Sequence, residues 1–227
     1  MNILNSMANP REKRTYTSPQ RQEQARATRL KMLEAARRLF VANGYVTTTL
    51  LAIAREAGVS AATVTATFRT KLGVFEALSA WSVRDDEIAR PLAEQPWWRE
   101  MLDEPDPARQ LARHASNVRR IHDRTTDLFE IARSAAGAEP EVAALRRRLG
   151  EAHLSDDRQV AQSLAQKGAL GPSVTPEQTT DLLWALGSAD LYRLLVVDRG
   201  WPREQYEQWL ASAWIHALLN PHIDHTT

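Results

Sequence analysis

Apolar residues along most of this chain recur at intervals of three and four, the spacing that places them on one face of a helix. No segment alternates apolar and polar residues as a half-buried strand does, and no internal repeat is visible. The first helix is predicted to begin at Ser18-Pro19, an N-cap followed by proline, and to end at Asn43-Gly44. Its apolar face comprises Leu30, Leu33, Ala36, Leu39 and Phe40. The pattern therefore predicts an all-α fold.

Three short-range helix signals follow the first helix closely. The threonines at 47–49 provide an N-cap for a helix that ends near residue 57. The tight turn at residues 58–60 ends in a serine, which caps a further helix to about residue 68. Thr70 then caps a fourth helix, which starts at Lys71 and continues until Pro91 stops it.

At least five more helices are predicted in the remainder of the chain, separated by proline and glycine. The clearest start is Thr175-Pro176-Glu177-Gln178, which combines an N-cap, a proline at the first helical position and a capping-box glutamine. The proline-containing span 91–105 is predicted to be poorly ordered. The five predicted helices cover about residues 107–122, 123–136, 140–166, 177–198 and 203–219.

Residues 48–71 carry the spacing of a helix-turn-helix. Small Ala54 lets the second helix approach closely, Gly58 supplies the backbone turn, and Ser60 caps the second helix. The space between the helices is filled by Ile53, Val59, Val64 and Phe68. These features together favour a helix pair that reads DNA, and a helical hairpin without any role in DNA binding is the alternative.

The net charge of +1 conceals a strong division along the chain. Residues 1–80 hold 12 Lys/Arg and 5 Asp/Glu, a balance of +7, whereas residues 81–227 hold 17 and 23, a balance of −6. A basic N-terminal part is typical of a module that binds a polyanion, because phosphate contacts dominate affinity for nucleic acid. Chance variation between small domains is the alternative explanation. Residues 1–20, with Arg11, Lys13 and Arg14, are predicted to be a disordered basic arm that lies in a minor groove or attracts DNA only non-specifically.

Several classes of protein are disfavoured by what the sequence lacks. Without cysteine, disulfides, thiolate metal sites and cysteine nucleophiles are excluded. No run of about 18 apolar residues is present, so we expect a cytoplasmic, nucleoid-associated protein without a membrane partner. The sequence also lacks H-E-x-x-H, G-x-S-x-G, a phosphate-binding glycine loop and a di-iron Glu-x-x-His pair. Because His114, His122 and His153 are scattered, we expect neither an enzyme nor a bound metal or cofactor.

The segment ARRLFVANGY at 36–45, with the TT, IA, AGVS and TF that follow it and Thr70-Lys71, resembles the TetR family of bacterial repressors. The resemblance covers about 50 residues, from Thr28 to about Leu78. It implies a homodimer that binds a palindromic double-stranded DNA operator and is released when an unidentified small-molecule effector occupies the C-terminal domain. The implied domains are the arm at 1–20, an N-terminal three-helix DNA-binding domain at 21–78, and a C-terminal helical bundle for ligand binding and dimerisation at 79–221.

The resemblance also implies which residues contact DNA. Thr48 and Lys71 match phosphate contacts at helix starts, where free N–H groups favour an anion. The predicted DNA-binding residues are Thr48, Thr49, Ser60, Ala61, Ala62, Thr63, Thr65, Thr67, Arg69 and Lys71. The chain departs from the family pattern at Thr65, where tyrosine is usual, at Thr67, where tyrosine or histidine is common, and at Leu72, where an acidic residue is usual. These departures put one usual phosphate contact in doubt.

The helix that would read bases is unusual in its chemistry. Its sequence, AATVTAT, holds no Arg, Asn or Gln, the side chains that recognise guanine or adenine with two hydrogen bonds. Only Arg69, at its end, is of this kind. We therefore expect specificity to come from thymine-methyl contacts, threonine hydroxyls and DNA shape.

Two sites are predicted in the C-terminal half. Small residues on helix 177–198 and apolar residues on the last helix suggest a dimer interface. Its predicted residues are Gly187, Ala189, Leu194, Leu210, Ala213, Trp214 and Ala217. Core packing within one chain is the alternative for these residues. Aromatic residues with a few polar groups, together with Trp97 and Trp98, suggest an effector pocket. Its predicted lining is Trp81, His114, Phe129, Arg133, His153 and Trp184, although each of these is also a candidate for the core.

A ligand-responsive transcription regulator is the leading functional hypothesis. The alternative is a helical small-molecule-binding protein whose operator binding is weakened or lost, because its reading helix lacks the usual tyrosine. Binding to the DNA upstream of its own gene would distinguish the two.

Overall fold

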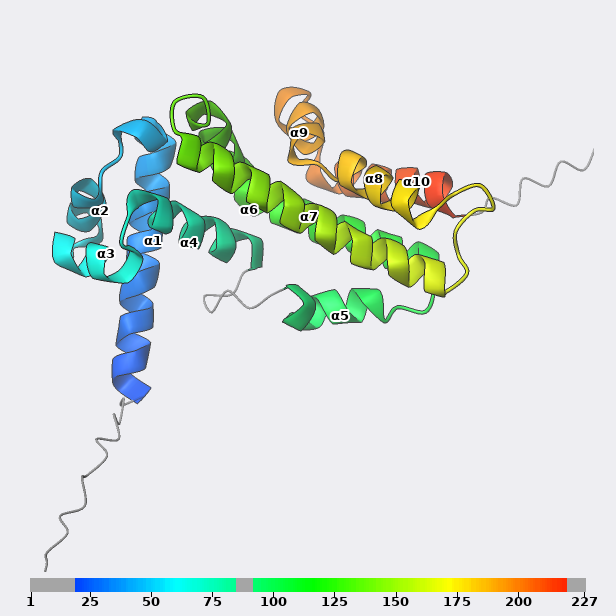
Figure 1. Ribbon diagram of the computed structural model, residues 1–227, viewed down its shortest axis with the longest axis horizontal. Helices are drawn as coiled ribbons and strands as arrows, with labels where there is room; N and C mark the ends of the chain where they lie inside the picture. The colour runs from blue at the N-terminus through cyan, green and yellow to red at the C-terminus, as the bar shows by residue number, and fades with distance from the viewer. Residues whose placement is uncertain (1–18, 85–91, 220–227) are drawn as a thin grey trace, which may run out of the picture.

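The computed structural model describes residues 19–84 and 92–219, and these confirm the predicted all-α fold (Figure 1). The basic arm predicted at the N-terminus falls, except for its last two residues, outside the described residues, as does Pro91. Within the described ranges, no helix is both long enough and apolar enough to cross a membrane.

Four helices form the N-terminal part, with α2 and α3 at the end of the molecule beyond α1 (Figure 1). They are α1 (Pro19–Thr47), α2 (Leu50–Ala57), α3 (Ala61–Phe68) and α4 (Lys71–Arg84). The regular helix of α1 is interrupted at Gly44, whose φ of 77° explains why the sequence predicted an end there. The start of α2 is capped by Thr49 and its end by Gly58 in the left-handed conformation.

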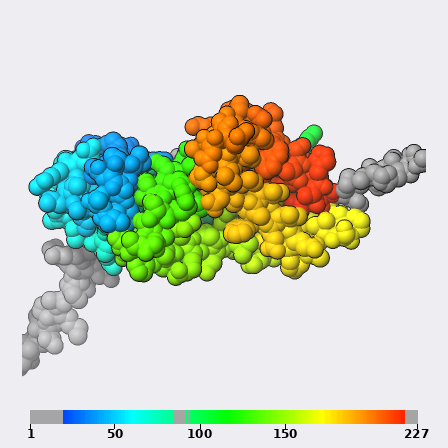
Figure 2. Space-filling view, turned by 90° about the horizontal axis from the view of Figure 1, so that it is seen from above, coloured from blue at the N-terminus to red at the C-terminus, as the bar shows by residue number. Residues whose placement is uncertain are grey.

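The C-terminal part is built on two long antiparallel helices, α6 (Pro107–Ala135) and α7 (Pro140–Gln166). The short helices η1 (Leu92–Glu94) and α5 (Pro96–Leu102) lie on one side of this pair, and α8 (Pro176–Leu186) and α10 (Arg203–Leu218) lie on the other (Figure 1). Between α8 and α10 come α9 (Ala189–Tyr192) and η2 (Arg193–Asp198), a π-helical segment. Viewed from above, the region of α8 to α10 lies far along the molecule from α2 and α3 (Figure 2).

Three sequence-based boundaries were wrong. The helices predicted at 107–122 and 123–136 are one continuous helix, α6, because nothing between them stops a helix. The span predicted to be poorly ordered contains α5, which buries Trp98 and Met101. The helix predicted at 177–198 ends at Gly187, and Ser188 caps a new one by accepting a hydrogen bond from the backbone N–H of Leu191.

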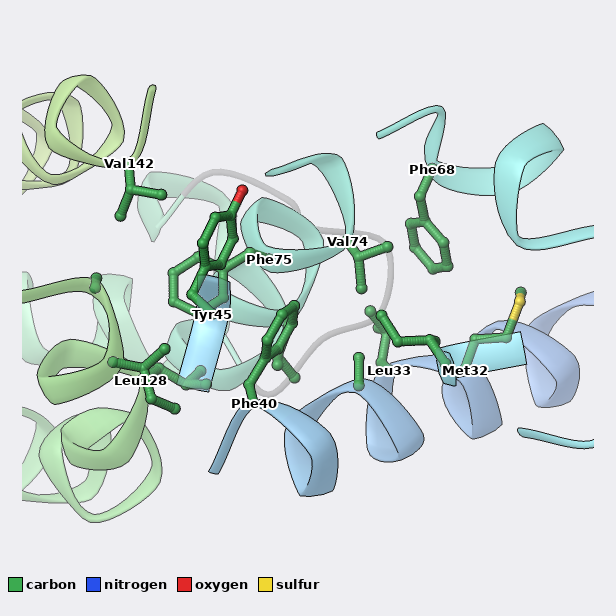
Figure 3. Close-up of a cluster of buried hydrophobic side chains, with 14 of the residues drawn as sticks. Met32, Leu33, Phe40, Tyr45, Phe68, Val74, Phe75, Leu128 and Val142 are labelled. Carbon is green, nitrogen blue, oxygen red and sulfur yellow. The ribbon is translucent and has the colours of Figure 1, made fainter. Parts of the chain in front are cut away.

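One hydrophobic core joins the N-terminal helices to α6 and α7 (Figure 3). Phe40, Tyr45 and Phe75 meet at its centre, with ring centroids 5.3 to 5.7 Å apart. Leu128 of α6 and Val142 of α7 belong to the same buried cluster. The N-terminal helices are therefore not a separately packed unit, because part of their core is supplied by the C-terminal helices.

A second core fills the far end of the α6–α7 pair. One of its two buried tryptophans, Trp214 of α10, is completely buried and stacks against His114 at 4.9 Å between ring centroids. Leu183 of α8 and Val160 of α7 are also completely buried there. This core fixes α8 and α10 against the long helices.

Gly73 controls how closely α3 and α4 approach. A Cβ at this position would lie 2.1 Å from the backbone oxygen of Phe68, a contact that only a main-chain shift could relieve. We expect Gly73→Ala to lower the free energy of unfolding by about 3 kcal/mol, as measured by urea denaturation.

Gly150→Ala is the matched control for this prediction, because Gly150 lies within α7 and its Cβ would meet nothing within 4 Å. This variant should gain about 1 kcal/mol from helix propensity. Equal stability of the two variants would contradict the account of the α3–α4 contact.

Candidate nucleic-acid interface

The pair α2–α3 is held as a helix-turn-helix by local hydrogen bonds and a small apolar seam. The backbone N–H of Val59 donates to the oxygen of Ala54, and Ser60 caps α3 by accepting a hydrogen bond from the N–H of Thr63 at 3.1 Å. Ala54, Ile53, Val64 and Phe68 are buried, as their spacing predicted. The turn therefore fixes which side of α3 faces solvent.

The outward side of α3 consists of alanine and threonine. Of the predicted DNA-contact residues at positions 60–69, six are exposed and Thr63 is half-buried. The exposed six are Ser60, Ala61, Ala62, Thr65, Thr67 and Arg69. The hydroxyl of Thr67 donates to the backbone oxygen of Thr63 at 2.8 Å, so it presents acceptor lone pairs outward. This surface offers methyl groups and hydroxyls to a ligand, with one guanidinium at its end.

Arg69 ends α3 in a strained backbone conformation. Its φ is 67° and its ψ is −53°, and among the described residues it is the only non-glycine residue with positive φ. Its backbone N–H donates to the oxygen of Thr65 at 2.9 Å and closes the helix. Such conformations cost about 1 to 3 kcal/mol and concentrate at functional sites.

The prediction that Thr48 contacts phosphate is wrong for the structure as it stands. Thr48 is only 3% exposed, and its hydroxyl donates to the backbone oxygen of Gly44 at 2.8 Å. The backbone oxygen of Leu39 is a second, longer acceptor at 3.3 Å. The start of α2 instead presents the exposed Thr49, whose hydroxyl oxygen accepts a hydrogen bond from the N–H of Ala52. Consecutive threonines hid this difference, because adjacent side chains of an extended segment point to opposite sides.

Lys71 has a structural role that its sequence motif did not reveal. Its ammonium donates to the backbone oxygens of Tyr45 at 2.9 Å and Val46 at 3.0 Å, and lies 4.3 Å from the centroid of the Tyr45 ring. These contacts join the start of α4 to the end of α1. One of its three N–H donors remains for another acceptor.

Arg29 is a neighbour of the recognition helix that sequence reasoning missed. Its guanidinium lies over the ring of Phe68, 4.7 Å from the centroid, and so connects α1 to the end of α3. The spacing of 39 residues gave no signal of this contact.

The predicted dimer residues divide between the inside and the outside of the chain. Leu210 and Trp214 are completely buried and Gly187 is packed against Trp214, so these three belong to the core of one chain, which corrects their assignment. Leu194 is 46% exposed and Ala217 is exposed, whereas Ala189 and Ala213 are half-buried. The apolar period of α10 is visible in the sequence, but the period alone does not show which side of α10 faces α6.

The predicted effector-pocket residues do not converge on one cavity. His114 and His153 do meet, on the two carboxylate oxygens of buried Asp157, at 3.2 and 3.3 Å. The other four lie apart from this pair. Trp81 packs on the first core, Phe129 contacts Arg146, Arg133 is exposed and paired with Glu130, and Trp184 is 44% exposed. The pocket assignment is corrected accordingly.

Burial controls the protonation of the groups inside the C-terminal part. It lowers the pKa of His122 to about 4, although the hydrogen bond with the backbone oxygen of Gly187 opposes this shift. Burial also lowers the pKa of His153, and burial followed by repulsion from Asp157 raises the pKa of Asp156 to about 6. Within the described part of the chain, no three His, Asp or Glu side chains are grouped so as to hold a metal ion.

Comparison with known proteins agrees with this architecture. Residues 32–78 match the family model described as bacterial regulatory proteins of the tetR family. A search of curated proteins finds no match.

Solved structures share the fold over nearly their whole length. NalD, the secondary repressor of the MexAB-OprM multidrug efflux pump in Pseudomonas aeruginosa, is 22% identical with a TM-score of 0.67, over 88% of this chain and 99% of its own. SmeT, solved in complex with triclosan, is 17% identical with a TM-score of 0.65, over 86% and 93%. A TetR transcription regulator from Haloarcula marismortui is 17% identical with a TM-score of 0.62, over 85% and 98%.

At identities of 17 to 22%, the similarity to these structures shows only that the fold is shared. The family-model match concerns the N-terminal part of the chain, residues 32–78. The helix-turn-helix lies within residues 32–78, which match the tetR family of bacterial regulatory proteins, and the chain as a whole shares the all-α fold of solved TetR regulators.

Proposed function

We propose that this protein is a ligand-responsive transcription repressor, which binds a palindromic operator as a homodimer and is released by a small molecule. The observation that carries the proposal is the exposed face of α3, held outward by the cap at Ser60 and the buried Val64 and Phe68. The basic balance of the N-terminal residues supports the same partner, because phosphate contacts dominate binding to DNA. NalD is a repressor, and SmeT was solved with a small molecule bound.

The DNA-binding surface is proposed to combine the face of α3 with the start of α2. Ala61, Ala62 and Thr65 would contact thymine methyl groups and base edges, and Thr49, Arg69 and Lys71 would contact phosphates. Thr48 positions this surface from inside, through its bonds to α1.

Dimerisation is proposed through the outer sides of α8 and α10. Trp184 is 44% exposed on α8, which is unusual for so large an apolar side chain, and exposed Ala217 lies on α10. A two-fold dimer would present two copies of α3 to two half-sites of an operator.

The alternative is a helical small-molecule-binding protein with weakened or lost operator binding. The absence of Arg, Asn and Gln from residues 61–67 and the engagement of Lys71 by two backbone oxygens favour it. A mobility shift with the DNA upstream of the protein's own gene distinguishes the two functions. Binding that weakens steeply with salt supports the repressor, and its absence at low salt supports the alternative.

A negative charge on α3 should abolish DNA binding without unfolding the protein. Ala62 is exposed in the first turn of α3, where a glutamate interacts favourably with the helix N-terminus, so Ala62→Glu should fold normally. We expect its affinity for operator DNA to fall at least about tenfold, by fluorescence anisotropy, because the carboxylate repels phosphates.

Gln205→Glu provides the control, since it adds the same charge in the exposed first turn of α10. It should bind DNA as the parent protein does. Equal affinities for the Ala62 and Gln205 variants would contradict the placement of the interface on α3.

Arg69 variants separate its charge from its backbone strain. Arg69→Ala should weaken binding across DNA sequences and reduce the salt slope by about 1, with little change of sequence preference. Arg69→Gly should lose the same affinity but raise the free energy of unfolding by about 1 kcal/mol, because glycine accepts a φ of 67°. A large change of preference in a binding-site selection would refute the proposed role of Arg69.

Trp184→Glu should shift the protein from dimer to monomer at micromolar concentration, as measured by sedimentation equilibrium. Leu149→Glu is the matched control, because Leu149 is 43% exposed on α7, outside the proposed interface. If both variants remain dimers, the interface lies elsewhere.

A further inference from the structure

The face of α1 that packs against the helix-turn-helix continues beyond the hydrophobic core. Met32 and Leu33 are buried members of that core, and Phe68 of α3 points toward the part of α1 that carries them (Figure 3). Arg29 lies three and four positions before these two residues, so it falls on the same face of the helix. It is half-buried just outside the core, and the first turns of α1 run on beyond the level of α3 (Figure 1).

The guanidinium of Arg29 is held in place while its N–H donors stay available. It lies 4.7 Å from the centroid of the Phe68 ring, and an interaction with the face of a ring leaves the five N–H groups in the guanidinium plane unoccupied. Among the described residues, no hydrogen bond or ion pair engages Arg29. A side chain that is already held in this way loses little further conformational freedom when it binds a partner.

The helices beside Arg29 supply no carboxylate to neutralise its charge. Residues 57–75, which contain α3 and the start of α4, hold Arg69 and Lys71 but no aspartate or glutamate. The glutamates that flank this segment, at 56 and 76, are each paired with another arginine. The end of α3 therefore carries an excess of positive charge, as a surface that binds a polyanion does.

We propose that Arg29 binds a phosphate of the DNA backbone at the border of the groove that α3 enters, an inference that rests on the function proposed above. With eight residues, α3 is about 12 Å long, close to the width of the major groove, so groups at its end lie near the strand that borders the groove. A guanidinium matches phosphate oxygens with two parallel hydrogen bonds. The phosphate fixes Arg29 and, through Phe68, the end of α3.

Such a contact positions the recognition helix and does not itself read the sequence. Residues 61–67 hold no Arg, Asn or Gln, the side chains that form two hydrogen bonds with a base. Positioning contacts with phosphates therefore carry a large share of the affinity of this protein for its operator.

The first test measures the salt dependence of DNA binding by the full-length protein, by fluorescence anisotropy, with a duplex from upstream of the protein's own gene as the probe. Arg29→Gln should bind at least about tenfold more weakly at low salt, because a hydrogen-bonded charge contact is lost. Its slope of log K against log salt should fall by about 1 for each protomer bound. Arg29→Lys keeps the charge and should keep the slope.

Lys31→Gln is the matched control, because it removes the same charge from an exposed side chain two residues further along α1. Two residues turn a helix by about 200°, so Lys31 faces away from Phe68. This variant should bind DNA with the slope of the parent protein. The contact is overturned if Arg29→Gln keeps the parent slope, or if both variants lose the same amount.

A second measurement separates a direct contact from a merely structural role of the cation over Phe68. Single phosphates of the probe duplex are replaced in turn by uncharged methylphosphonates. At one position in each half-site, the replacement should weaken binding of the parent protein but not of Arg29→Gln, which has already lost that contact. If every replacement weakens both proteins by the same factor, Arg29 only supports Phe68 and the proposal is overturned.

Failure of the proposed function gives a different result from failure of this contact. If the parent protein binds neither this duplex nor genomic fragments at low salt, the repressor function fails and the Arg29 contact fails with it. If the parent protein binds DNA and only the differences expected for Arg29→Gln are missing, the contact alone fails.

Discussion

The packing of Tyr45 is the contact on which the arrangement of the molecule depends. Its ring is buried between Phe40 and Phe75, its hydroxyl donates to Glu141 of α7 at 2.9 Å, and the ammonium of Lys71 lies over its face. The residue therefore touches α1, α4 and α7 at once. Since α2 and α3 connect α1 to α4, fixing these helices also fixes where the recognition helix faces.

This shared core has a consequence for how the two parts of the protein communicate. The division at residue 78 drawn from the sequence cuts through α4, whose first half packs under α3 and whose last turn is held by Arg124 of α6. The pair Arg37–Asp127 and the pair Arg148–Glu76 join the same parts at the surface. Because α4 belongs to both parts, a shift of the C-terminal helices would have a direct route to α3 through it.

The sequence predicted local features well, because they depend on residues close in the chain. The caps at Ser60 and Thr175 and the buried seam of Val64 and Phe68 all lie where local rules put them. Features that depend on residues far apart in the chain could not be predicted from the sequence. The burial of Thr48 depends on the oxygens of α1, and the inward side of Trp214 depends on α6.

The proposed function depends on α3 reading DNA as half of a two-fold pair. Selection of genomic fragments by the purified full-length protein, followed by sequencing, tests this most directly. We expect enrichment of a palindrome whose half-sites lie about 10 base pairs apart from centre to centre, or a multiple of this. The half-sites should be rich in A·T pairs, with thymine methyl groups at the contacted positions. Absence of enrichment, or enrichment of a site without two-fold symmetry, would contradict it.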